Sequence, residues 1–178
     1  FMIQAMGGIM SVTGEPDGSP MKVGVGIADV MCGMYATISI LSAIRHRDQA
    51  GKSGAGGNGQ HIDLALLDSQ AAWLINSGLN YLTSGENQHR LGNAHPNIVP
   101  YQVFQTSDSY FVLAIGNQIQ FRKFCEFAGA PELPDDSRFI TNTDRVNNRK
   151  ELALKINDLT KRYSTQYWLE ELEKLQVP

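Results

Sequence analysis

One carboxylate in this sequence stands where it could act as a nucleophile. Asp29 follows an apolar, glycine-spaced run at residues 23–28 (VGVGIA) and precedes a long apolar segment that the sequence predicts to be a helix. Aspartate is a favoured helix N-cap because its side chain accepts a hydrogen bond from an amide of the first turn, and the helix dipole stabilises negative charge there. A partly desolvated carboxylate held in this way can attack an activated acyl group. A carboxylate that only caps the helix would show the same pattern, so both interpretations stand.

The helix that would hold Asp29 is predicted to be buried. Residues 30–44 (VMCGMYATISILSAI) are apolar on almost every face, which is typical of a core helix. The run is about fifteen residues long, short of the roughly 20 that span a bilayer, so we expect no membrane segment. Arg45, His46 and Arg47 follow, and cations suit a helix C-terminus.

The other elements follow from hydrophobic periodicity and turn residues, and together they predict an α/β fold. We expect a helix at 1–10, a surface loop at 14–20, a strand at 60–66, a helix at 67–83, a polar linker at 84–97, a β-hairpin with strands at 101–106 and 110–115, and helices at 117–128, at 145–163 and from Ser164 or Thr165 onward. The predicted buried faces carry Leu67, Ala71, Leu74, Ile75, Leu79 and Leu82 in the helix at 67–83, Phe121, Phe124, Cys125 and Ala128 in the helix at 117–128, and Val146, Leu152, Leu154, Ile156 and Leu159 in the helix at 145–163.

A glycine-rich segment, Gly51–Gly59, contains the spacing G-x-G-x-x-G at Gly54, Gly56 and Gly59. A dinucleotide-binding loop needs a strand before it and a helix after it, whereas here the predicted order is reversed. The context favours a surface loop, with phosphate binding as the alternative.

Composition excludes several classes of protein. The 178 residues are 42% apolar and 19% charged with a net charge of −3, as in an ordinary globular protein. No basic stripe is visible, which argues against nucleic acid as a partner. Cys32 and Cys125 lie in apolar helical patterns, so we expect buried free thiols in a reducing, cytoplasmic compartment. No Cys/His spacing indicates a metal site.

Several short motifs share one order with a known family. They are FMIQAMGGIMSVTG at 1–14, GVGIAD at 24–29, GQHIDL at 59–64, GNAHP at 92–96, AIGNQIQF at 114–121 and RVNNR at 145–149. In this order they resemble the class III CoA-transferases, the superfamily of formyl-CoA transferase, carnitine CoA-transferase and α-methylacyl-CoA racemase. Members of that superfamily are considerably longer at both ends, so we expect this chain to be the middle of such a protein.

The resemblance implies a fold and an assembly. Members have a large Rossmann-like domain, a smaller domain, and linkers that thread two subunits into an interlocked homodimer. Residues 1–84 would then be part of the large domain, 85–97 a linker and active-site loop, and 98–178 the small α+β domain with its hairpin.

The resemblance also implies a chemistry, in which Asp29 is the catalytic carboxylate. It would attack a CoA thioester to form an acyl anhydride and then take up CoA as an aspartyl thioester. The substrates would be an acyl-CoA and a carboxylic acid, with no cofactor bound covalently at rest. The amides of residues 29–31 are candidates to stabilise the oxyanion of each step.

Two further groups of residues are candidates for CoA binding. In formyl-CoA transferase-like members a glycine-rich loop covers the site. The similar position here holds Gly92, Asn93, Ala94 and His95, with one glycine in place of several. This loop is either a lid or an ordinary linker turn, and His95 is either an acid–base group or a surface residue.

The second group is Gly116, Asn117 and Gln118. In the racemase branch a similar segment carries a carboxylate, whereas the Gln118 amide has no titratable group and cannot give or take a proton as an acid or base. This difference favours transfer of CoA between carboxylic acids. Two alternatives remain open, namely an acyl-CoA racemase or epimerase, and a chain that is by itself a non-catalytic folding or dimerisation module.

Overall fold

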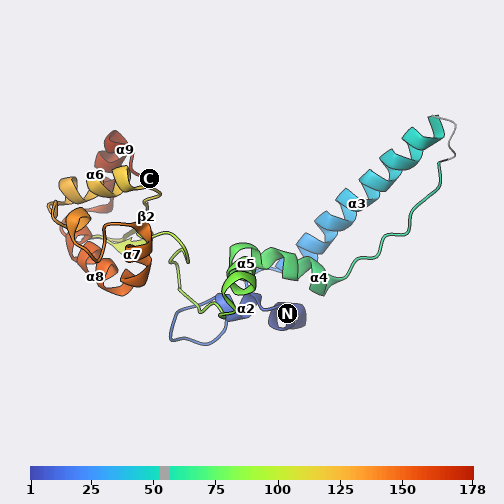
Figure 1. The fold of residues 1–178 in the computed structure, drawn as a ribbon, viewed down its shortest axis with the longest axis horizontal. Helices are drawn as coiled ribbons and strands as arrows, with labels where there is room; N and C mark the ends of the chain where they lie inside the picture. The colour runs from blue at the N-terminus through green and yellow to red at the C-terminus, as the bar shows by residue number, and fades with distance from the viewer. Residues whose placement is uncertain (53–56) are drawn as a thin grey trace. The chain divides into compact units, whose positions relative to one another are not determined.

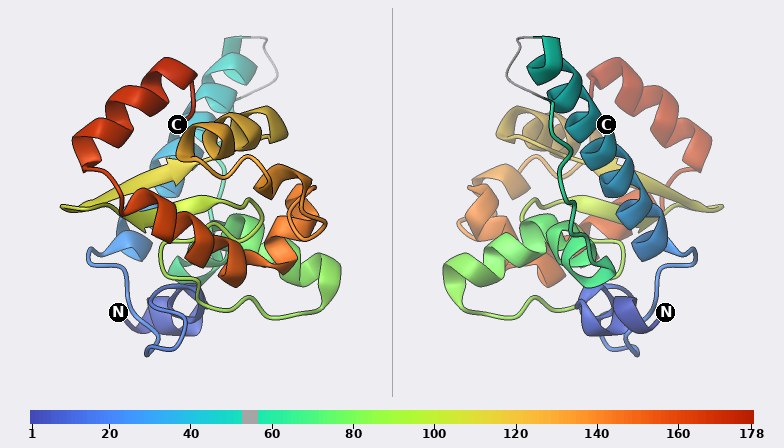
Figure 2. Two further views of the ribbon diagram at one scale, coloured as in Figure 1. Left: turned by 90° about the vertical axis from the view of Figure 1, so that its left-hand side faces the viewer. Right: turned by 90° about the vertical axis from the view of Figure 1, so that its right-hand side faces the viewer.

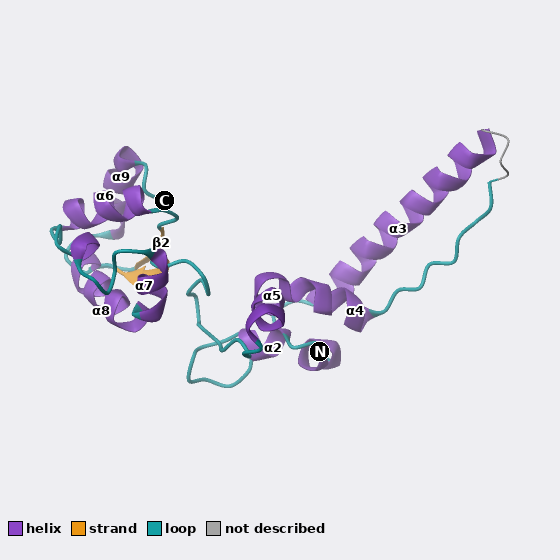
Figure 3. Cartoon of the chain, in the orientation of Figure 1, coloured by secondary structure: helices purple, strands orange, loops and turns teal. Residues whose placement is uncertain are grey.

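The structure is a computed structural model that describes residues 1–52 and 57–178 (Figure 1). It divides into two compact units, Phe1–Gly92 and Asn93–Pro178, and each is described by itself. The described residues are mostly helical, with one small two-stranded sheet (Figure 3). The middle of the Gly51–Gly59 segment lies outside the described residues, and so does the prediction of a surface loop there.

The first unit consists of helices. They are α1 (Met2–Met6), α2 (Ile9–Val12), α3 (Ile27–Lys52), α4 (Leu66–Ala71), the short 3₁₀ helix η1 (Ala72–Leu74) and α5 (Ile75–Ser84). The helix expected at 1–10 is interrupted because Gly8 lies in the left-handed region, with φ of 83°.

Helix α3 is exposed, so the prediction of a buried helix is wrong. Only Ala28 and Met31 are buried along it, whereas Val30, Ile38 and Leu41 expose 55%, 58% and 61% of their surface. Helix α4 packs against α3, and Figure 1 shows α3 extending away from α4 and α5. In length and composition α3 would suffice to cross a membrane, unlike the run of about fifteen residues considered above, but core helices of soluble proteins meet the same test.

The strand predicted at 60–66 does not form. Residues 60–65 have no regular secondary structure, and α4 begins at Leu66. An open hollow of about 620 Å³ lies between part of this segment and α3. Its lining includes Ser39 and His46 of α3 and His61 of the segment. A strand needs a neighbour for its backbone hydrogen bonds, and the described part of the first unit contains no other strand.

The helix predicted at 67–83 is broken, and its buried face is also wrong. Ile75 has a φ of 45° at the junction of η1 and α5, a conformation that a β-branched residue rarely adopts. Ile75, Leu79 and Leu82 are 69%, 63% and 80% exposed. The buried residues are Ser69 and Gln70 of α4, because α4 packs against α1 and α3 on that side.

The second unit is built on an antiparallel hairpin, as predicted. Strands β1 (Tyr101–Gln105) and β2 (Tyr110–Ala114) pair in a register that joins Tyr101 to Ala114 and Gln105 to Tyr110. Side chains alternate along β2, where Phe111 and Leu113 are buried while Val112 is exposed. One face of the hairpin therefore packs on the core.

Helices α6, α8 and α9 supply much of the rest of that core, and residues outside the helices, among them Phe139 and Val177, complete it (Figure 2). The helices of this unit are α6 (Gln118–Ala128), α7 (Asn142–Asn147), α8 (Arg149–Thr160) and α9 (Thr165–Leu175), with a 3₁₀ turn, η2, at Leu133–Asp135. The buried face predicted for α6 is confirmed. Trp168 of α9 lies among Phe111, Phe124 and Phe127 and donates a hydrogen bond to the Thr160 carbonyl at 2.7 Å.

The helix predicted at 145–163 differs from the structure in its limits and in one inward residue. It begins earlier, at Asn142, because Thr141 and Asp144 form a reciprocal capping box. The helical run is broken at Asn148, with φ of −109° and ψ of 24°. Leu154 is 69% exposed, whereas Leu152 and Ile156 are fully buried. Ser164 caps α9, as predicted.

Candidate functional site

Asp29 lies in the first turn of α3, as its third residue, and its side chain is exposed. It is therefore not the N-cap that we predicted, although negative charge in the first turn still has a favourable interaction with the helix dipole. Asp29 Oδ2 lies 3.2 Å from where a Cβ would stand on Gly26. The carboxylate thus lies close to the glycine that precedes the helix, and it is exposed to solvent.

The amides at the start of α3 are already engaged. The N–H groups of Asp29 and Val30 both donate to the Gly26 carbonyl, each at 3.1 Å. They are not available to the oxyanion of an acyl-transfer step, so the prediction is wrong for these two amides. A short turn at the helix start uses the donors that the sequence suggested were unpaired.

The residues before Asp29 are held by Gln4, which the sequence analysis did not single out. Gln4 Nε2 donates to the Val25 carbonyl at 3.1 Å, and Gln4 Oε1 accepts from the Val23 amide at 2.8 Å. Gln4 is only 2% exposed. One feature of the sequence could have drawn attention to it, namely an amide side chain inside the apolar run FMIQAM. If such a side chain is buried, it requires hydrogen-bond partners.

Further hollows lie in the first unit besides the one beside α3. One is a narrow gap, too small to admit a water molecule, that is lined by Ile27, Ala28, Gln70 and other side chains. A larger cavity of about 520 Å³ is lined by both apolar and polar side chains, including Leu74, Tyr81 and Arg90, and no carboxylate contributes to its wall. Asp29 lines neither of them.

Gly92 is the last residue of the first unit. Its amide donates to the Gly14 carbonyl at 3.0 Å, and its φ of 58° lies in the left-handed region that favours glycine. A Cβ at this position would stand 3.1 Å from Glu15 Oε2. The backbone conformation and the close contact together explain why glycine is suited to this turn.

Asn93, Ala94 and His95 belong to the second unit. His95 Nδ1 accepts hydrogen bonds from the amides of Asn97 and Ile98, both at 3.1 Å, and its ring stacks on Tyr101 with 5.2 Å between the ring centroids. Arg149 donates to the His95 carbonyl at 3.1 Å. The imidazole therefore shapes its own loop, and an accepting Nδ1 leaves the proton of the neutral ring on Nε2.

Gly116, Asn117 and Gln118 lie at the start of α6. Asn117 Oδ1 accepts from the Gln120 amide at 2.9 Å, and Gln120 Oε1 accepts from the Gly116 amide at 3.0 Å. Gln118 Oε1 accepts from Arg145 Nη1 at 2.7 Å. The polar atoms of this group are thus used in capping the helix and in binding Arg145.

Arg145 connects these residues to Val99, which follows the linker that contains His95. It is 2% exposed, donates to the Val99 carbonyl at 2.7 Å and to the Phe139 carbonyl at 3.0 Å, and stacks over the Phe121 ring at 4.4 Å. Burial lowers the pKa of this guanidinium. The RVNNR motif at 145–149 therefore brings two candidate segments of the second unit together.

Neither cysteine is paired in a disulfide. Cys125 is buried, as predicted, and burial raises the pKa of its thiol to about 12, which keeps it protonated and unreactive. Cys32 is only half-buried. Within residues 1–52 and 57–178, no group of three or more His, Cys, Asp or Glu side chains could hold a metal ion.

Comparison with known proteins places this geometry in a family. The sequence profile of CoA-transferase family III matches residues 1–178. The chain is 44% identical over 178 residues to succinate–glutarate CoA-transferase of Agrobacterium fabrum, covering 100% of this chain and 43% of that protein. It is 39% identical over 174 residues to succinyl-CoA:glutarate CoA-transferase of Mus musculus, covering 98% and 38%. The chain thus spans less than half the length of these relatives.

Solved structures agree in fold. A CAIB/BAIF family protein from Brucella suis is 47% identical, with a TM-score of 0.74, over 100% of this chain and 46% of that one. A hypothetical protein from Mycobacterium tuberculosis is 20% identical, with a TM-score of 0.80, over 99% of this chain and 45% of that one. At this lower identity the likeness shows the fold alone.

Proposed function

This chain belongs to CoA-transferase family III, and we propose from that membership that the full-length protein transfers coenzyme A between carboxylic acids, with Asp29 as its nucleophile. The observation that carries the assignment of Asp29 is its placement. It is an exposed carboxylate in the first turn of α3, beside a glycine that leaves its oxygens room.

The proposed reaction is a series of acyl exchanges on the Asp29 carboxylate. Asp29 attacks the donor thioester, which breaks the C–S bond, releases CoA thiolate and leaves an acyl–aspartyl anhydride. The thiolate then attacks the aspartyl carbonyl, releasing the first acid and leaving an aspartyl–CoA thioester. The acceptor carboxylate enters by the reverse of these two steps. They regenerate the free Asp29 carboxylate and release the new acyl-CoA. Covalent catalysis of this kind divides one difficult exchange into easier ones.

The substrates that we propose are short dicarboxylic acids and their CoA thioesters. Support comes from the names of the relatives, which include succinate–glutarate, succinyl-CoA:glutarate and acetyl-CoA:oxalate CoA-transferases at 44%, 39% and 36% identity. Succinyl-CoA as donor and glutarate as acceptor are therefore the pair to assay first.

We further propose that the first unit is part of a Rossmann-like domain and that the full-length protein is a cytoplasmic, interlocked homodimer. The exposed apolar surface of α3 supports this view, because a helix with Ile38 and Leu41 in solvent is normally covered in a complete fold. The relatives are more than twice as long as this chain, which leaves ample sequence to cover it.

The experiment is intact-protein mass spectrometry of the full-length protein incubated with succinyl-CoA. We expect a CoA adduct on the peptide that holds Asp29, and we expect Asp29→Asn to abolish both the adduct and the turnover. Asp63→Asn is the matched control, because Asp63 is another exposed carboxylate of the first unit. Turnover by Asp29→Asn at the wild-type rate would exclude the proposal.

Two further experiments distinguish the other candidate activities. A racemase would exchange the α-hydrogen of a branched acyl-CoA with solvent deuterium and would need no acceptor acid. A protein consisting of residues 1–178 alone should show no measurable CoA binding by calorimetry if the site needs further segments of the full-length protein.

A further inference from the structure

We infer that Gln4 is a positioning residue for Asp29. It holds the glycine-spaced segment that leads into α3, and through that segment it fixes where the Asp29 carboxylate lies. This inference rests on the proposed function of Asp29, but the contacts that support it are independent of that proposal.

The segment before Asp29 gains little from packing. A Cβ on Gly24 would meet no atom within 4 Å, and the Val25 side chain is 63% exposed. Glycine also has the largest conformational freedom to lose on folding. A segment with glycines at positions 24 and 26 and so few side-chain contacts requires another source of order.

The Gln4 amide supplies that order through two hydrogen bonds. Its Nε2 donates to the Val25 carbonyl and its Oε1 accepts from the Val23 amide, at 3.1 and 2.8 Å. One planar amide thus pairs with a donor and an acceptor two residues apart, because its oxygen and one of its N–H groups can face the same side. Gln4 is the buried residue of α1. Its side chain is therefore held in place by packing, and it binds the segment to that helix.

The same hydrogen bonds continue to Asp29. The Val25 carbonyl that accepts from Gln4 also accepts from the Ile27 amide at 2.8 Å, and the neighbouring Gly26 carbonyl accepts from the Asp29 amide at 3.1 Å. Two adjacent peptide groups therefore link the Gln4 side chain to the backbone of Asp29.

Position matters for the proposed chemistry because Asp29 has to serve two partners in turn. Its oxygen attacks the acyl carbon first, and its own carbonyl then receives the thiolate. A displacement of about 1 Å in such a group can slow a reaction by about a hundredfold. Loss of the Gln4 amide should therefore slow the formation of the aspartyl adduct without weakening the binding of the thioester.

The test measures the first-order rate constant of CoA-adduct formation on Asp29 in the full-length protein at saturating succinyl-CoA. This rate constant does not depend on the fraction of protein that is folded, which affects only the amplitude. We expect Gln4→Met to lower it by about ten- to a hundredfold while KM for succinyl-CoA stays within about threefold of wild type. Gln4→Glu retains an acceptor for Val23 but no donor for Val25 at neutral pH, so its rate constant should lie between the two.

Gln70 provides a matched control. It is also a glutamine of the first unit that is 2% exposed, but neither Nε2 nor Oε1 has a hydrogen-bond partner among the described residues. Gln70→Met should leave the rate constant unchanged. An unchanged rate constant in Gln4→Met, with a normal adduct on Asp29 in the wild type, would overturn this inference alone. Absence of the adduct in the wild type would overturn the proposed function, and this inference with it.

Discussion

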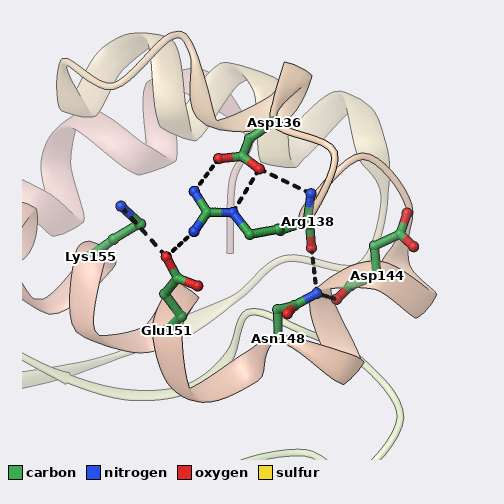
Figure 4. A network of polar contacts seen from close by, with 6 residues as sticks. All are labelled: Asp136, Arg138, Asp144, Asn148, Glu151 and Lys155. Atoms are coloured by element: carbon green, nitrogen blue, oxygen red, sulfur yellow. Dashed lines mark hydrogen bonds and ion pairs between the residues drawn. The ribbon is translucent and has the colours of Figure 1, made fainter.

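Arg138 shows how single residues of the second unit contribute to stability. Its guanidinium donates to Asp136 Oδ1 at 2.9 Å and pairs with Glu151, which also lies 3.9 Å from Lys155 Nζ (Figure 4). The Asp136 carboxylate accepts a further bond from the Arg138 amide at 3.0 Å. These bonds to Arg138 lower the pKa of Asp136 from 3.8 to about 2.

This shift predicts how stability depends on pH. Because the pKa is lower in the folded state than in the unfolded state, the contribution of Asp136 is fully present above about pH 4 and is lost as the pH falls towards 2. The melting temperature of Asp136→Asn, measured by circular dichroism, should therefore fall less between pH 4 and pH 2 than that of the wild type. Asp158→Asn removes one negative charge from α8 outside this network and should keep the wild-type slope. Equal slopes in all three proteins would contradict the assignment.

Few of the contacts around the candidate site residues could have been predicted from the sequence. The motif at residues 24–29 drew attention to Asp29, but its position in the first turn depends on a turn at Gly26 that spacing does not specify. Gln4 binds backbone groups 19 and 21 residues away in sequence, and Arg145 binds one that is 46 residues away. Such contacts depend on tertiary structure, which periodicity does not reveal.

At the scale of elements, α8 shows which apolar positions of a helix contribute to the free energy of folding. Leu152 is fully buried in the core, whereas Leu154, two residues along the same helix, is 69% exposed. Both are leucines inside Arg149–Thr160, so their substitution by alanine changes helix propensity equally. The pair therefore separates burial from the intrinsic preference for helix.

We predict that Leu152→Ala destabilises the second unit by about 2–5 kcal/mol through lost burial and a residual cavity. Leu154→Ala should change the free energy of unfolding by no more than about 0.5 kcal/mol. Urea unfolding followed by Trp168 fluorescence measures both, with Trp73→Phe as the common background so that only one tryptophan reports. Similar losses in the two variants would show that the core described around α8 is wrong.

The elements of the second unit were largely predicted from sequence because each carries its own local signal. The hairpin has alternating strands around Ser107-Asp108-Ser109, α6 has a capping asparagine at Asn117, and α9 has a capping serine at Ser164. The break at Asn148 was missed because residues on both sides of it favour helix. In the first unit, by contrast, apolar periodicity predicted burial that no described neighbour of α3 or α5 provides.

At the scale of the whole molecule, the two units differ in how much of their apolar surface they bury. The second unit encloses one contiguous core that includes Phe121, Phe124 and Trp168. The first unit buries few large apolar side chains and exposes many, among them Val30, Ile38 and Leu41 of α3 and Leu82 of α5. Exposed apolar surface of this kind normally meets another protein surface.

A protein consisting of residues 1–178 should therefore self-associate through its first unit. We expect its mass from light scattering to rise with concentration and an apolar fluorescent dye to bind, whereas residues 93–178 alone should stay monomeric and bind little dye. Ile38 and Leu41 are three residues apart and so lie on one face of α3, and replacing both with lysine should reduce association and dye binding. Leu154→Lys, an exposed leucine of the second unit, should change neither. A concentration-independent monomer that binds no dye would mean that residues 1–178 cover α3 themselves, contrary to the exposure described above.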